Sequence, residues 1–231
     1  MHKQAWSVFT FLLFINSVFL SHAQQNTTRL WISGTSQVRV HNKWSLHLEA
    51  QFRSYEITPN TEQQLARGGI NYHINSASFA TVGYAYVTNF AFDKEQYEDV
   101  QVTENRIWQQ YFIRIPYEKS TIENRFRLEQ RWLESANKIQ YLNRIRYLLR
   151  ANIPLIKNIA NEKIVSMSFY NEIFLHFSPI TFDRNRLAAE LVYQLNPNLK
   201  LQAGYMAQTT NATTNHIILT GVTYNPDLRK K

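Results

Sequence analysis

Apolar and polar residues alternate with a period of two along most of this chain. Between Trp44 and Arg53, aliphatic and aromatic residues occupy one face and polar residues the other. The same alternation recurs at 121–133, 186–195 and 199–208. An amphipathic helix would place apolar residues three and four positions apart, so the pattern predicts β-strands.

The alternating runs predict eleven strands, at residues 28–40, 43–55, 65–74, 78–90, 103–115, 121–133, 139–153, 164–177, 184–195, 199–210 and 215–225. All six prolines fall between these runs, as expected for a residue that cannot donate to a strand ladder. The six glycines lie within the runs. Glycine inside a strand often marks a bend or bulge, so these positions predict where the sheet curls.

Several runs are longer than the usual strand of about five or six residues. They suit the ~9–11 residues that a tilted strand needs to cross a bilayer. Short links alternate with longer polar ones such as 56–62 and 91–102, which is the layout of outer-membrane barrels. We therefore predict an all-β fold: an antiparallel up-and-down transmembrane β-barrel of about 10–12 strands with a polar, Arg/Glu-rich lumen.

Strand parity bears on this prediction. Bacterial single-chain barrels have even strand numbers, so eleven runs imply that one does not span, or that one is missed or merged. The run 28–40 is the weakest member, because by the short-turn rule it would start on the outside.

The first 23 residues have the three parts of a secretory signal peptide. A basic start at Lys3 precedes an apolar run over 5–20, and Ser21 and Ala23 supply small residues before a cut at Gln24. The apolar run is shorter than the ~20 residues that a spanning helix needs. We expect a signal peptide at 1–23 and a single β-barrel domain at 24–231, located in the outer membrane.

The sequence contains no cysteine, which excludes disulfides, thiolate catalysis and cysteine-based zinc sites. Its formal net charge is +8 at pH 7. Export argues against nucleic acid as the partner of this basic protein. Outer-membrane lipids and small anionic solutes are the expected partners, and no oligomeric state is predicted.

Arginine and glutamate share the polar faces of the runs from 103 onward. The predicted charge ladder of the lumen comprises Glu104, Arg106, Arg114, Glu123, Arg125, Arg127, Glu129, Arg131, Arg144, Arg146, Arg150, Glu172, Arg186 and Glu190. One interpretation is an ion-paired network that fills a narrow lumen, since guanidinium groups pair well with carboxylates. The other is an arginine-lined path for anions, since arginines outnumber glutamates on these faces. The predicted role is thus a structural barrel or a small, anion-preferring pore.

The lipid-facing side is predicted from the aromatic residues. Tyrosine and tryptophan are frequent toward the ends of apolar faces, as at Trp44, and such rings form the girdles of membrane barrels. Four amides share the apolar faces and argue against insertion: Asn124, Gln130, Asn143 and Asn171. A soluble periplasmic β-protein that buries its apolar face gives the same alternation and is the alternative.

Candidate catalytic groups are scattered along the strands: His47, His73, His176 and His216, with Ser45, Ser54, Ser166 and Ser168. No nucleophile–base spacing fixes a role for any of them. The chain has no Gly-rich phosphate loop, no His-Glu-x-x-His motif and no acidic calcium loop. We assign no catalytic residue, metal site or cofactor, and keep an outer-membrane enzyme acting on lipid or lipopolysaccharide as an alternative.

Spaced motifs then suggest a family: 105–110 (NRIWQQ), 124–132 (NRFRLEQRW), 143–147 (NRIRY), 170–174 (YNEIF), 185–187 (NRL) and 201–205 (LQAGY). In these motifs the chain resembles the bacterial family catalogued as domain of unknown function 2490. The resemblance implies an outer-membrane β-barrel of the kind found in Bacteroidota and some Proteobacteria, with no assigned reaction. The tail at 225–231 departs from barrel custom, because outer-membrane strands usually finish on an aromatic residue near the terminus.

Overall fold

The computed structural model describes residues 28–58, 60–92, 100–136, 138–157, 163–177 and 179–229. The predicted signal peptide at 1–23 lies outside these residues. Eleven strands make up most of the described chain: β1 (Arg29–His41), β2 (Trp44–Ser54), β3 (Thr61–His73), β4 (Ser78–Phe90), β5 (Val100–Tyr117), β6 (Ser120–Ser135), β7 (Lys138–Lys157), β8 (Lys163–Phe177), β9 (Ile180–Asn196), β10 (Leu199–Thr209) and β11 (Thr214–Tyr224). No helix long and apolar enough to span a membrane occurs in this described part.

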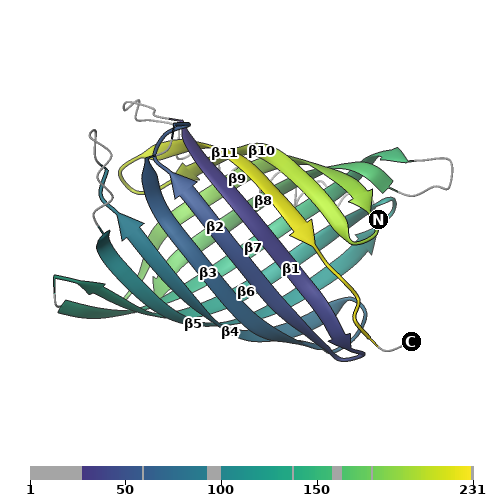
Figure 1. The fold of residues 1–231 in the computed structure, drawn as a ribbon, viewed down its shortest axis with the longest axis horizontal. Helices are drawn as coiled ribbons and strands as arrows, with labels where there is room; N and C mark the ends of the chain where they lie inside the picture. Colours follow the sequence, from purple (N-terminus) through teal and green to yellow (C-terminus); the bar gives the residue numbers. More distant parts are fainter. Residues whose placement is uncertain are drawn as a thin grey trace.

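The strands form one closed barrel in which each strand pairs with its neighbours in sequence (Figure 1). The predicted all-β barrel of ten to twelve strands is confirmed. Ten seams are antiparallel, and the barrel closes where β1 pairs with β11 in parallel, with Arg29 opposite Ile217 and Thr35 opposite Thr223. The run over 28–40 is therefore a member of the closed barrel, although its seam with β11 is the shortest, with seven paired positions.

The odd strand number explains the parallel seam. In an up-and-down barrel the strands alternate in direction, so the first and last of eleven run the same way. β1 thus begins at one rim and β11 ends at the other. We call the rim with the connections 42–43, 74–77, 118–119 and 197–198 the turn rim, and the rim with the connections 55–60 and 210–213 the loop rim.

The polarity of the barrel wall is inverted relative to a water-soluble protein. Outward-facing aliphatic side chains are open to the surroundings, with Leu48 and Leu191 each 50% exposed. Inward-facing charged side chains are enclosed, with Glu104 1% and Arg127 2% exposed. The one cluster of buried apolar side chains that packs inside the described barrel lies on one wall and comprises Trp31, Ala188, Met206, Ile217 and Leu219.

Two glycines create room for a large side chain inside the barrel. A Cβ at Gly83 would lie 2.5 Å from Cζ2 of Trp108, and a Cβ at Gly69 would lie 3.0 Å from the same atom. The Trp108 indole therefore occupies the space in front of these two glycines. Register shifts lie elsewhere in the described strands, for example between Phe174 and Leu175, so the prediction that the glycines mark bulges is wrong.

Candidate functional site

A layer of paired charges covers the lumenal side of the neighbouring strands β5 to β9, with Glu129 of β6 at its centre. Its side chain is fully enclosed. Glu129 accepts hydrogen bonds from Arg144 at 2.6 and 2.8 Å and from Arg146 at 2.8 Å. Arg106 and Arg127 lie 3.5 and 3.9 Å away. One carboxylate thus faces four guanidinium groups that come from three strands.

Two further carboxylates extend this arrangement. Glu104 accepts from Arg131 through both carboxylate oxygens, at 2.7 and 2.9 Å, and from Arg106 at 2.8 Å. Glu172 accepts from Arg146 at 2.7 and 2.9 Å and from Arg125 at 2.7 Å. We call the whole set the ion-paired layer: Glu104, Arg106, Arg125, Arg127, Glu129, Arg131, Arg144, Arg146, Glu172 and Asp183, which pairs with Arg144 at 2.9 Å.

Aromatic rings fill the space between the guanidinium groups. The Phe174 ring contacts Arg146 at 4.3 Å and Arg186 at 4.6 Å from the ring centroid. The Trp108 ring contacts Arg127 at 4.7 Å. Planar guanidinium groups stack favourably on such rings. Charged and aromatic side chains therefore pack against one another inside the barrel.

The remaining members of the predicted ladder also line the lumen. Arg114 pairs with Glu123 at 2.9 Å, and Arg150 lies 3.8 Å from Glu190. Arg186 donates to the neutral Gln208 at 2.8 Å and lies 3.9 Å from Glu172.

Several charged side chains of the lumen were missing from the predicted ladder: Glu49, Arg53, Arg67, Asp183, Arg184 and Lys200. Glu49 and Arg53 stand on the polar face of an alternating run, and this position was the signal that could have included them. Asp183 lies where the register between β8 and β9 shifts, so alternation gives no guide to its direction.

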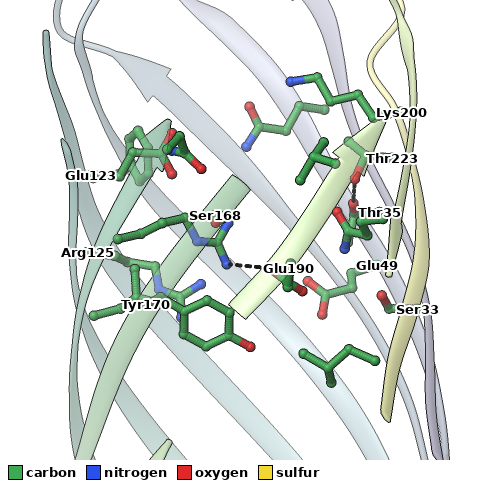
Figure 2. A pocket seen from close by; sticks show the side chains of 18 of the residues that line it. Ser33, Thr35, Glu49, Glu123, Arg125, Ser168, Tyr170, Glu190, Lys200 and Thr223 are labelled. Carbon is green, nitrogen blue, oxygen red and sulfur yellow. Dashed lines mark hydrogen bonds and ion pairs between the residues drawn. The ribbon is translucent and has the colours of Figure 1, made fainter. Parts of the chain in front are cut away.

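A cavity of about 570 Å³ lies in the lumen beside the ion-paired layer and extends to the turn rim. We call it the cup. Arg125, Arg127, Arg146 and Glu172 of the layer form its floor, and its wall reaches Asn225 beyond the end of β11. In Figure 2, Arg125 and Glu190 face Glu49 and Thr35 across this space, and Lys200 stands above them.

A chain of neutral hydrogen bonds runs up one wall from the layer. Arg127 donates to Gln110, which donates to Thr81 at 3.2 Å. Thr81 donates to Asn71 at 2.7 Å, and Asn71 donates to Ser45 at 2.9 Å. These contacts link β6 to β2 and fix the neutral side of the lumen.

This chain ends on a serine–histidine pair. The Ser45 hydroxyl lies 2.8 Å from Nε2 of His73. Such a contact is typical of a nucleophile and its base, but Ser45 is only 2% exposed and already accepts from Asn71. A substrate cannot reach the hydroxyl without displacing this wall, so the pair is structural.

The other candidate histidines are not grouped with serines. His47 faces the cup beside Glu49, at 3.3 Å, and its ring packs edge-on against Trp108. His216 is outside the lumen and contacts the Tyr205 hydroxyl. Among the described residues, no group of three or more His, Asp or Glu side chains is arranged to hold a metal ion.

Comparison with known proteins adds a family but no activity. The family model described as protein of unknown function (DUF2490) matches residues 28–218. This range includes the ion-paired layer and every residue that lines the cup except Leu219, Thr220, Thr223 and Asn225. No curated protein matches the chain.

Proposed function

The chain belongs to the DUF2490 family of proteins of unknown function, and from this premise we propose that it is an outer-membrane β-barrel whose lumen is closed by the ion-paired layer. The closed strand order shows that the chain forms a barrel. The membrane location and the closed, structural role are the proposal. The observation that carries it is the inverted polarity of the wall.

A water-soluble barrel would bury its apolar side chains inward. In this barrel the exposed large apolar side chains occur on all eleven strands, for example Leu48, Phe126 and Leu201. A soluble monomer rarely exposes contiguous apolar patches larger than a few hundred Å². Hydrocarbon is the solvent that suits this surface, and the soluble periplasmic alternative leaves it uncovered.

The four amides on the apolar faces do not oppose insertion, because each has a partner. Gln130 and Gln109 exchange two hydrogen bonds, at 3.0 and 3.3 Å. Asn171 and Asn185 do the same, at 2.9 and 3.2 Å. Tyrosine hydroxyls donate to Asn124 and Asn143, at 2.7 and 2.8 Å. Paired polar groups cost much less in an apolar medium than free ones.

The turn rim is the better candidate for the periplasmic side. Outer-membrane barrels have short periplasmic turns. By the strand bounds, the five connections at this rim are two to five residues long, whereas those at the loop rim range from two to nine, and β11 also ends at the turn rim. With this orientation the cup opens to the periplasm. The loop rim, with the connection between β4 and β5, faces the cell exterior.

Fractionation tests the membrane location. We expect the protein in the outer-membrane fraction, retained after washing with carbonate or high salt and released only by detergent. Folded and heat-denatured samples should also migrate differently in electrophoresis, as closed barrels do. Release without detergent would show that the protein is not integral and would reject the proposal.

Conductance tests the closed lumen. We expect purified protein in planar bilayers to give no steady current, because in this proposal the enclosed ion pairs of β5 to β9, with Phe174 and Trp108 packed between them, block the lumen. The second candidate is a small pore, favoured by the excess of arginines, and it requires anion-preferring current. Steady current of that kind would replace the structural role with the pore, and cation preference would reject both.

A further inference from the structure

We propose that the cup is a binding site for an amphiphilic anion, a phosphate monoester or carboxylate carried on one apolar chain. The site goes beyond the proposed function and does not depend on it, because the cup is a feature of the barrel whether or not the barrel lies in a membrane. Fractionation tests the location and titration tests the ligand, so either can fail alone.

The first argument is charge. Nine basic side chains line the cup: Arg53, Arg67, Arg114, Arg125, Arg127, Arg146, Arg150, Arg186 and Lys200. Four carboxylates accompany them: Glu49, Glu123, Glu172 and Glu190. The wall therefore has five more positive than negative groups. In a confined space with low-dielectric walls, such an excess attracts an anion.

The second argument is a set of buried donor atoms that lack an acceptor and belong to side chains lining the cup. Nη1 of Arg127, Nε of Arg125 and Nε of Arg150 are enclosed and make no hydrogen bond to a described residue. The hydroxyl of Ser168 is also enclosed and makes no hydrogen bond to a described residue, and Ser168 as a whole is 1% exposed. Buried polar groups normally have partners, and an unmet donor costs free energy. An oxyanion offers several acceptor oxygens to such donors.

The strand register brings these donors together. On β7 and β8, Arg150 stands opposite Tyr170, and Ser168 is the next inward residue toward the turn rim. On β6 and β7, Glu123 stands opposite Arg150, and Arg125 is the next inward residue toward the loop rim. Figure 2 shows Arg125, Ser168 and Tyr170 on one side of the open space. These residues mark where we place the headgroup.

The third argument is the apolar part of the wall. Phe79 and Phe112 stack at 4.7 Å on one side of the cup, between its floor and the turn rim. Leu148, Tyr170 and Val192 line the opposite side. A volume of about 570 Å³ falls within the ~300–1,000 Å³ that is typical of small-molecule sites. The cup therefore suits a headgroup at its floor with an apolar chain directed toward the turn rim.

Titration of the full barrel tests this site, in nanodiscs of zwitterionic lipid or, if fractionation shows that the protein is not integral, in buffer. Dodecyl phosphate and laurate are the probes, inorganic phosphate carries the charge alone, and dodecanol carries the chain alone. We expect one molecule of dodecyl phosphate or laurate per chain, with inorganic phosphate and dodecanol at least about tenfold weaker. The tighter of the first two identifies the headgroup. Equal binding of dodecanol and both acids would overturn the proposal.

Three variants and a matched control locate the site. Arg125→Gln and Ser168→Ala should each weaken binding, by about tenfold and about threefold, since a charge-assisted hydrogen bond is stronger than a neutral one. Glu190→Gln should strengthen it, because the substitution removes the carboxylate nearest to Arg150. The control is Arg184→Gln, which removes a lumenal arginine that pairs with Asp183 and does not line the cup.

If the arginine variant fails to fold, Ser168→Ala still tests the site. The Ser168 hydroxyl makes no hydrogen bond to the described residues, so its removal should not destabilise the barrel. The folded state of each variant is checked by its heat-dependent migration. Unchanged affinity in both Ser168→Ala and Glu190→Gln would show that the probes bind elsewhere, and would overturn the assignment to the cup.

Discussion

Arg146 donates two hydrogen bonds to one oxygen of Glu172, at 2.9 Å from Nε and 2.7 Å from Nη2. Its remaining nitrogen, Nη1, donates to Glu129 at 2.8 Å. Arg146 lies on β7, and its two acceptors lie on the strands on either side. One guanidinium group therefore ties three consecutive strands together inside the barrel, and the layer around it acts as a set of cross-braces.

Glu129→Gln is expected to destabilise the barrel strongly. The substitution keeps the shape of the side chain but leaves Arg144, Arg146 and Arg106 without the carboxylate that they share. Removing one partner of a buried charge pair typically costs ~3–5 kcal/mol. The free energy of unfolding, measured by urea titration of refolded protein, should fall by about this amount.

The control for this prediction is Arg114→Gln. Arg114 pairs with Glu123, but its side chain is 55% exposed near the turn rim. An exposed pair contributes about 0–1 kcal/mol, so the unfolding free energy should change little. If both variants lost the same free energy of unfolding, the enclosure of Glu129 would not increase its contribution to stability.

Gly83→Ala is expected to lower stability through overpacking. A methyl group at Gly83 would overlap with the backbone carbonyl oxygen of Gly68 and would lie 2.5 and 2.6 Å from two atoms of the Trp108 indole, and that ring is fully buried. Overpacking of this kind typically costs ~1–3 kcal/mol, measured as a lower urea midpoint. Gly34→Ala is the matched control, because a Cβ at Gly34 has no atom within 4 Å. If Gly34→Ala lowered the midpoint as much, backbone effects and not the indole would explain the loss.

A double replacement at Gln109 and Gln130 tests the outer face. Each single change to leucine leaves one amide facing outward without its partner, which costs ~1–3 kcal/mol if the medium is hydrocarbon. Changing both should restore most of the loss, because two leucines suit an apolar medium. Unfolding from lipid vesicles gives the four free energies of the cycle. Additive losses in the double variant would contradict a lipid-facing position for this pair.

The period-two alternation was enough to predict the strands and the inward direction of the arginines. It failed at rims, where both faces are polar. The segment 61–64 (TEQQ) belongs to β3, in which Gln63 pairs in register with Asn89 of β4. Residues 180–183 at the start of β9 were also missed. Asp183 is an extra residue at a register shift with β8, so the alternation is broken there.

The contacts of the candidate site were beyond the sequence. Alternation gives the direction of a side chain but not its height along the barrel, which depends on the tilt of all eleven strands together. Arg125 on β6 and Glu172 on β8 are 47 positions apart in the sequence. Only β7 separates their strands, so the two side chains reach each other inside the barrel and form a hydrogen bond of 2.7 Å. The floor of the cup is built from contacts of this kind. The alternation pattern alone therefore could not distinguish an open lumen from a filled one.

The tail after β11 is held against the start of the barrel. Leu228 donates its backbone N–H to the carbonyl of Arg39 at 2.8 Å, and Arg39 donates to Pro226 at 2.9 Å. Between them, Asp227 accepts from Nε of Arg229 at 2.8 and 3.1 Å. Residues 226–228 thus continue the parallel seam between β1 and β11.

Asp227 is expected to remain ionised in acid while the tail is in place. Hydrogen bonds from the Arg229 side chain and backbone lower the pKa of Asp227 to about 2, whereas an unfolded aspartate titrates near ~3.9. Because the folded pKa is the lower one, the contribution of this contact is fully present above about pH 4 and is lost as the pH falls through about 2. Carbon-13 NMR of the Asp227 carboxyl measures the midpoint directly, and Arg229→Gln should return it to about 4. A wild-type midpoint near 4 would mean that Arg229 does not pair with Asp227 in solution.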